Sequence, residues 1–109
     1  MKNIILCSSN PILIKSLYAI LRDEGCNVDT VDHPALAVQK VMFGLYDFVI
    51  VDSEPFGLSA EDAVRIIRTV APGMPIVHVG AGSHEEPSMA VETPIDLEEF
   101  KRTIHSIAV

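Results

Sequence analysis

The sequence predicts an α/β domain in which a doubly wound parallel sheet of five strands is covered by helices on both faces. Short apolar runs alternate along the chain with longer segments of helical periodicity. One run, residues 48–51, is apolar throughout, as expected for a central strand buried on both sides. With 109 residues, 49% of them hydrophobic, the chain can bury such a sheet, and we expect one domain over residues 1–109.

The first strand and helix are predicted from a short apolar run and a capping pattern. Residues 3–7 indicate a buried strand. Asn10 followed by Pro11 is typical of a helix N-cap and its first helical residue. Gly25 ends this helix. We expect one broad apolar face on it, made of Leu13, Ile14, Leu17, Tyr18, Ile20 and Leu21.

The second strand and helix follow directly. Residues 27–31 predict the strand, with Val28 and Val31 as its buried members. Pro34 opens the next helix and Gly44 closes it. The apolar residues expected to pack against the sheet are Leu36, Val38, Val41, Met42 and Phe43.

The third helix lies between residues 48–51 and a fourth apolar run. Ser59 and Asp62 have the spacing of a capping box, which predicts the start of the helix. Pro72 ends it, and residues 75–79 form the fourth strand. The inward-facing residues are expected to be Ala63, Ile66, Ile67 and Val70.

The regular alternation breaks after the fourth strand. Residues 80–88 have loop composition without helical periodicity, so the helix expected there is missing or vestigial. Residues 89–92 predict a short last strand, and Asp96 and Glu99 hold N-cap and N3 positions of a final helix. Its apolar face repeats at helical spacing through Leu97, Phe100, Ile104 and Ile107.

The carboxyl ends of the predicted strands should carry the functional site, because loops from parallel strands converge there. Ser8 and Ser9 follow the first strand, and Asp52 follows the third. Gly80 and Thr93 follow the fourth and fifth strands. Asp52 is therefore the strand-end carboxylate at the centre of the predicted sheet.

Two segments resemble motifs of response-regulator receiver domains, the flavodoxin-like modules of two-component phosphorelay signalling. Residues 44–52 match the G-x-Y-D-[apolar]₄-D pattern around the family's phosphoacceptor, with Pro55 and Gly57 following as that pattern requires. Residues 93–100 resemble the family's K-P-[apolar]-D-x-x-E-[apolar] ending. The motifs stand in the family's order, and the likeness covers nearly all of the chain except residues 80–92.

The resemblance makes Asp52 the candidate phosphoacceptor, but the pocket around it departs from the pattern. Family members hold Mg²⁺ with an acidic pair that is Ser8 and Ser9 here, and serine carries no charge. Asp52 with a backbone carbonyl near Glu54 would make a poor Mg²⁺ site. We therefore expect no cofactor, Mg²⁺ being possible only if this degenerate pocket still binds it.

Two further family positions are altered. The lysine that pairs with phosphoryl oxygens is Thr93, and the hydroxyl at the end of the fourth strand is Gly80. These changes predict a degenerate receiver, or pseudo-receiver, that is not an enzyme and acts through protein contacts with weak or no Mg²⁺-dependent phosphorylation. A functional phosphoacceptor that uses Asp52 is the alternative.

A phosphocysteine carrier is a more distant alternative, because Cys7 ends a strand ahead of a helix. Small tyrosine phosphatases share that arrangement but need an Arg six residues after the cysteine, where this chain has Leu13. Pro11 would also stiffen a loop that has to wrap an oxyanion. Cys7 and Cys26 are expected to be buried and to form no disulfide framework.

Charge and hydropathy limit the partners. The net charge is −7 without a basic stripe, which argues against direct nucleic-acid binding. No apolar run approaches the roughly 18–20 residues of a membrane span, and we expect a cytoplasmic protein. The four histidines fall on different elements and predict no metal site. The resemblance implies a histidine kinase or a downstream signalling protein as partner, or a homodimer, with Lys101, Arg102 and His105 on the contact surface.

Overall fold

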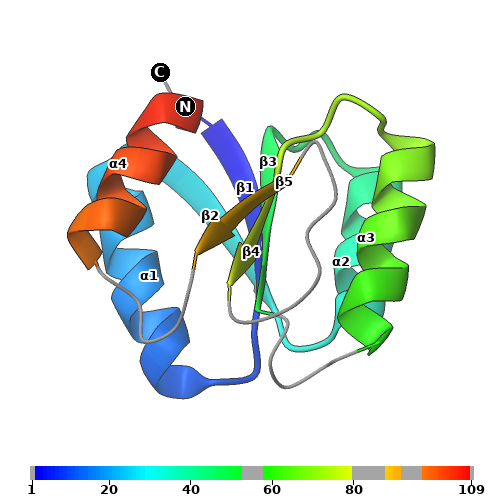
Figure 1. Ribbon diagram of the computed structural model, residues 1–109, viewed down its shortest axis with the longest axis horizontal. Coiled ribbons are helices and arrows are strands. Elements are labelled where there is room, and N and C mark those ends of the chain that lie inside the picture. The colour runs from blue at the N-terminus through cyan, green and yellow to red at the C-terminus, as the bar shows by residue number, and fades with distance from the viewer. Residues whose placement is uncertain (1, 53–57, 80–87, 92–96, 109) are drawn as a thin grey trace.

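The computed structural model describes residues 2–52, 58–79, 88–91 and 97–108. Its sheet is parallel, with strand order β2-β1-β3-β4-β5, so β2 is an edge strand and β3 lies at the centre (Figure 1). The predicted five-stranded parallel sheet is confirmed. Its strands are β1 (Lys2–Cys7), β2 (Cys26–Val31), β3 (Phe48–Asp52), β4 (Ile76–Val79) and β5 (Ser88–Val91).

The helices form two layers around this sheet. In Figure 1, α1 and α4 lie on one side of the strands, and α2 and α3 lie on the other. The prediction that a helix is missing before β5 falls on residues 80–87, which lie outside the described residues. The described helices are α1 (Pro11–Asp23), α2 (Pro34–Phe43), α3 (Leu58–Val70) and α4 (Leu97–Ala108), and none of them is long and apolar enough to cross a membrane.

The start and end of α1 follow the predicted signals. The Asn10 side chain caps the helix by accepting hydrogen bonds from the backbone N–H groups of Ile12 at 3.1 Å and Leu13 at 3.3 Å. Pro11 occupies the first helical position, where no N–H donor is needed. Gly25, with φ of 82°, adopts the left-handed conformation that ends the helix. These contacts fix the direction in which α1 leaves β1.

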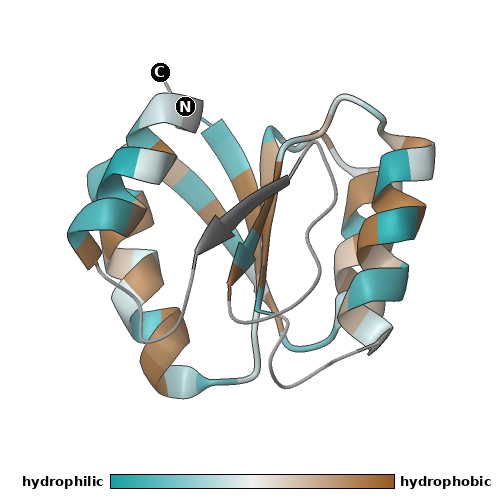
Figure 2. Ribbon diagram, viewed as in Figure 1, coloured by the Kyte–Doolittle hydropathy of each residue, from teal (hydrophilic) through white to brown (hydrophobic). Residues whose placement is uncertain are grey.

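Side chains of β3 alternate between two separate cores. On the α1–α4 side, Phe48 and Ile50 pack with Phe100 and Ile104 of α4. On the α2–α3 side, Val49 and Val51 pack within a second cluster. The strand is buried at all five positions, in agreement with its continuous apolar sequence, and it is coloured largely as hydrophobic in Figure 2.

The predicted packing face of α2 is partly wrong. Leu36, Met42 and Phe43 are 41%, 56% and 86% exposed, whereas Ala37 and Val41 are buried against the sheet. Nearly every position of this short helix is apolar, so its periodicity does not select one face. The small side chain of Ala37 allows the helix to approach the strands closely.

The predicted faces of α3 and α4 also need correction. Ile66 and Val70 are 46% and 47% exposed, and the buried face of α3 consists of Ala60, Ala63, Val64 and Ile67. Ser59 lies inside α3 rather than at its N-cap. Leu97 of α4 is 46% exposed, while Phe100 and Ile104 are fully buried as predicted.

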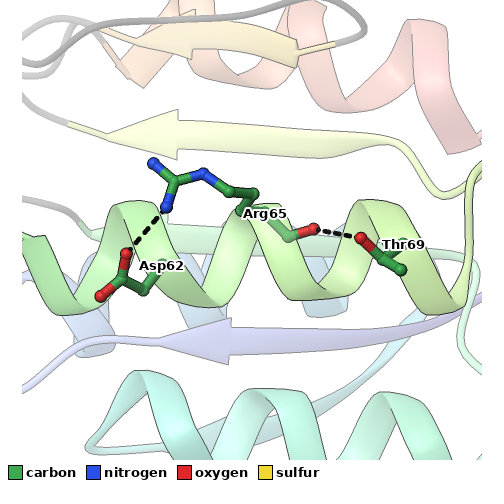
Figure 3. Close-up of polar contacts among 3 residues, drawn as sticks. All are labelled: Asp62, Arg65 and Thr69. Atoms are coloured by element: carbon green, nitrogen blue, oxygen red, sulfur yellow. Dashed lines mark hydrogen bonds and ion pairs between the residues drawn. The ribbon is translucent and has the colours of Figure 1, made fainter.

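The outer surface of α3 is polar and locally paired. Arg65 donates a hydrogen bond from Nη1 to Asp62 Oδ1 at 3.0 Å, and the Thr69 hydroxyl donates to the Arg65 carbonyl oxygen at 3.1 Å (Figure 3). Both charged side chains of this pair are more than 60% exposed. Such an exposed pair contributes little to folding stability.

Candidate functional site

Parallel register brings Ser8 and Asp52 together at the carboxyl edge of the sheet. Cys7 of β1 is paired with Val51 of β3, so the residues that follow them lie side by side. Asp52 is itself paired with Val79, whose side chain belongs to the core on the α1–α4 side. Ser8 is 0% exposed and Asp52 is 3% exposed. The predicted central carboxylate is thus buried beside a serine.

The Ser8 hydroxyl makes two hydrogen bonds in this buried position. It donates to Asp52 Oδ2 at 2.9 Å and accepts from the backbone N–H of Asn10 at 3.1 Å. The backbone N–H of Ser8 donates to the Val31 carbonyl oxygen at 3.0 Å, which fixes the backbone from which the side chain extends. A buried carboxylate needs hydrogen-bond donors to offset its lost hydration, and Ser8 supplies one.

In the described part of the pocket, Asp52 is the buried carboxylate that a Mg²⁺ ion could bind. Magnesium prefers six oxygen ligands in octahedral geometry and is usually bound through one or two carboxylates. One oxygen of Asp52 already accepts the Ser8 hydroxyl, and Ser9 is exposed and uncharged. Within the described residues, no group of three His, Cys, Asp or Glu side chains could hold a metal ion. Glu54, Gly80 and Thr93, the other predicted pocket residues, lie outside the described residues.

Cys7 has the environment of a structural thiol. It is 0% exposed and points into the core on the α2–α3 side. Burial, together with the negative charges of Asp52 and Asp32, raises the pKa of the Cys7 thiol to about 12. Because the thiolate is the nucleophile, a buried thiol that stays protonated at neutral pH is poorly suited to carry a phosphoryl group. The geometry gives the phosphocysteine alternative no support. Both Cys7 and Cys26 are free and buried, as expected.

A pocket that was not predicted from the sequence adjoins Ser8. It has a volume of about 580 Å³ and opens beside the carboxyl end of β2. Asp32 and Lys40 contribute opposite charges to its lining, and Ile14 and Leu36 contribute apolar surface. The one feature of the sequence that pointed to this pocket is the position of Asp32 directly after the second strand. His78, in contrast, is buried in β4 at 4% exposure, in agreement with its predicted place inside a strand.

The predicted contact surface lies on the exposed side of α4. Lys101, Arg102 and His105 are all exposed, and they line a shallow hollow of about 330 Å³ between α4 and the end of α1. Glu24 and Ser106 also contribute to this hollow. The structure therefore brings the three predicted residues together around one hollow.

The parallel order β2-β1-β3-β4-β5 is that of flavodoxin-like α/β folds, and a buried aspartate lies here at the tip of β3. The response regulator TrrA of Thermotoga maritima, solved in complex with Mg²⁺-BeF, is 26% identical, with a TM-score of 0.83 over 98% of this chain and 99% of that one. The complex of TrrA with the histidine kinase ThkA gives 27% identity and a TM-score of 0.80, with 98% of each chain covered.

A third solved structure is the receiver domain of a sensor histidine kinase from Pseudomonas aeruginosa, with a magnesium ion in its active-site cleft. It is 22% identical, with a TM-score of 0.83 over 98% of this chain and 97% of that one. No protein-family model and no curated protein sequence matches the chain. The structural matches confirm the resemblance predicted from the two motifs at the level of the fold: the chain has the fold of response-regulator receiver domains.

Proposed function

We propose that this chain is an atypical receiver module of phosphorelay signalling that acts through protein contacts, with weak or no Mg²⁺-dependent phosphorylation. The observation that carries the proposal is the buried hydrogen bond from Ser8 to Asp52. It stands where the resembling family places an acidic residue that binds metal. The Asp52 carboxylate thus receives a hydrogen bond from a side chain of the protein itself.

Electrostatics support this proposal. Replacing two acids by Ser8 and Ser9 removes two negative charges from the pocket, and the affinity of a hard cation depends on such charges. A metal ion at Asp52 Oδ2 would also compete with the Ser8 hydroxyl for that oxygen. A hydrogen bond to a charged group contributes about 1.5–3 kcal/mol. Phosphoryl transfer to Asp52 would lose the cation that normally neutralises the transferring group.

A protein partner is supported by the comparison in which TrrA is bound to a histidine kinase. In this chain the exposed Lys101, Arg102 and His105 of α4 form a candidate contact surface. A histidine kinase, a downstream signalling protein and a second copy of the chain are the partners to be distinguished. None of them requires chemistry at Asp52.

A metal titration tests the proposal directly. Mg²⁺ is added to the ¹⁵N-labelled chain up to about 20 mM, first alone and then with beryllofluoride, and amide shifts around Asp52 are followed. We expect no saturable change for the wild type. The matched control is Ser8→Asp/Ser9→Asp, which restores both acidic positions and should show saturable Mg²⁺ shifts. Saturable shifts of the wild-type amides at low millimolar Mg²⁺ would overturn the proposal.

A phosphotransfer assay separates the two alternatives. The chain, Asp52→Asn and Cys7→Ser are each incubated with a radiolabelled phosphodonor kinase. We expect little label on the wild type. Label that is lost in Asp52→Asn would identify a functional phosphoacceptor, and label that is lost in Cys7→Ser would identify a cysteine carrier.

A further inference from the structure

We propose that Ser8 is a positioning residue that relays the state of Asp52 to the N-terminal cap of α1. The inference deepens the proposed function, since it takes Asp52 as the group whose state is signalled. It does not depend on whether that state is set by a phosphoryl group, a metal ion, a proton or a bound partner.

The relay is a continuous path of short contacts. Asp52 Oδ2 accepts from the Ser8 hydroxyl at 2.9 Å, and the same hydroxyl oxygen accepts from the backbone N–H of Asn10 at 3.1 Å. Asn10 is the residue that caps α1, through its side-chain oxygen and the N–H groups of Ile12 and Leu13. Its carbonyl oxygen also accepts the first helical hydrogen bond, from Ile14 at 3.0 Å. Two hydrogen bonds therefore separate the carboxylate from the helix start.

The Ser8 hydroxyl has few alternatives to this arrangement. A hydroxyl has one proton to donate, and here it is directed to Asp52. Ser8 is 0% exposed, and its backbone is fixed by the bond to Val31. If Oδ2 ceases to accept, the bond that holds the Ser8 oxygen in its present rotamer is lost. A change of χ1 then moves the oxygen away from the Asn10 N–H and alters the backbone at the cap of α1.

The far end of the relay is accessible to a partner. Asn10 and Pro11 are exposed, and Ile12 in the first turn of α1 has a side chain that is 79% exposed. A change in the cap would alter how this turn presents Ile12. The state of a buried carboxylate would thereby become visible at the protein surface.

Amide NMR on four proteins tests the relay: the wild type, Asp52→Ala, Ser8→Ala and the double variant, all without metal or phosphodonor. In Asp52→Ala we expect shifted amides at Asn10, Ile12 and Leu13, and roughly fivefold faster exchange in the first turn, the factor expected for loss of an N-cap. In the Ser8→Ala background the same Asp52 substitution should add no further change at the cap.

The controls keep the result decisive. Ser9→Ala alters the exposed neighbour and should leave the response to Asp52→Ala intact. Should Asp52→Ala not fold, Asp52→Leu removes the acceptor while filling the space. An equal effect of the Asp52 substitution with and without the Ser8 hydroxyl would overturn the relay. The relay experiment contains no Mg²⁺. Metal binding in the titration above would therefore refute the proposal of weak or absent Mg²⁺-dependent phosphorylation without affecting the test of the relay.

Discussion

His105 Nδ1 lies 3.1 Å from the Glu24 carboxylate oxygen Oε2 and thereby joins α4 to the residue that caps the end of α1. The His105 side chain is 66% exposed, so the pair contributes little to stability and remains open to competition from solvent and partners. This contact lies on the proposed partner surface of α4, and we therefore expect substitutions on that surface to leave the domain folded.

We expect Arg102→Glu to abolish capture of the protein partner in a pull-down from native extract while the circular dichroism spectrum stays unchanged. The substitution reverses a charge on the exposed side of α4 without touching the core. Arg65→Glu is the matched control, because Arg65 is also exposed but lies on α3, on the other side of the sheet from α4 (Figure 1). Unchanged capture by Arg102→Glu, or equal loss in the control, would argue against the α4 surface.

Ser8→Ala should lower the free energy of unfolding by about 1.5–3 kcal/mol, because it removes a donor from a buried carboxylate. Urea unfolding at pH 7 measures the change. Ser9→Ala, on the exposed neighbour, should change stability by less than about 0.5 kcal/mol. Similar values for the two variants would mean that the buried hydrogen bond does not stabilise the fold.

Cys7 should make the fold sensitive to alkaline pH. Its pKa is raised to about 12 in the folded chain, so the unfolded chain loses the thiol proton first as the pH rises. The contribution of the protonated Cys7 thiol to the free energy of unfolding is complete below about pH 8.5, the pKa of the thiol in the unfolded chain. It is lost progressively as the pH rises to about 12. Urea midpoints between pH 8 and 10.5 should therefore fall more steeply for the wild type than for Cys7→Ala. Parallel curves would contradict the raised pKa.

The ionisation of the Tyr46 phenol should also be observable at alkaline pH. Its hydroxyl donates a hydrogen bond to Asp29, and this bond, with burial and the Asp29 charge, raises the phenol pKa to about 12. An ultraviolet titration at 295 nm should show a late phenolate step that disappears in Tyr46→Phe. Asp29→Asn should move that step to lower pH, because it removes the charge that opposes ionisation. A late step that persists in Tyr46→Phe would assign it elsewhere.

The strands and the first helix could be predicted because each depends on local signals. Asn10, Pro11 and Gly25 act within a few residues of the helix ends that they determine, and the short apolar run of β3 is typical of a strand buried on both faces. The packing of α2 could not be predicted in this way. Phe43 and Met42 are as apolar as Val41, and only the position of the neighbouring strands decides which of them is buried.

The site was predictable in outline for a similar reason. Parallel strands end at one edge, so Ser8 and Asp52 had to lie near each other once β1 and β3 were neighbours. The hydrogen bond between them depends on side-chain rotation, which no sequence pattern specifies. The link to Asn10 was missed because it uses a backbone N–H, a group that every residue except proline carries.

The position of β2 at the edge of the sheet has a consequence for self-association. An unprotected edge strand can recruit a strand from another molecule, and charged side chains discourage that pairing. The outward residues of β2 include Asn27, Asp29 and Thr30, and Asp29 is also held by Tyr46. A second copy that added a strand here would have to strip water from a carboxylate. Any homodimer is therefore better served by helix-to-helix contact than by extending the sheet through β2.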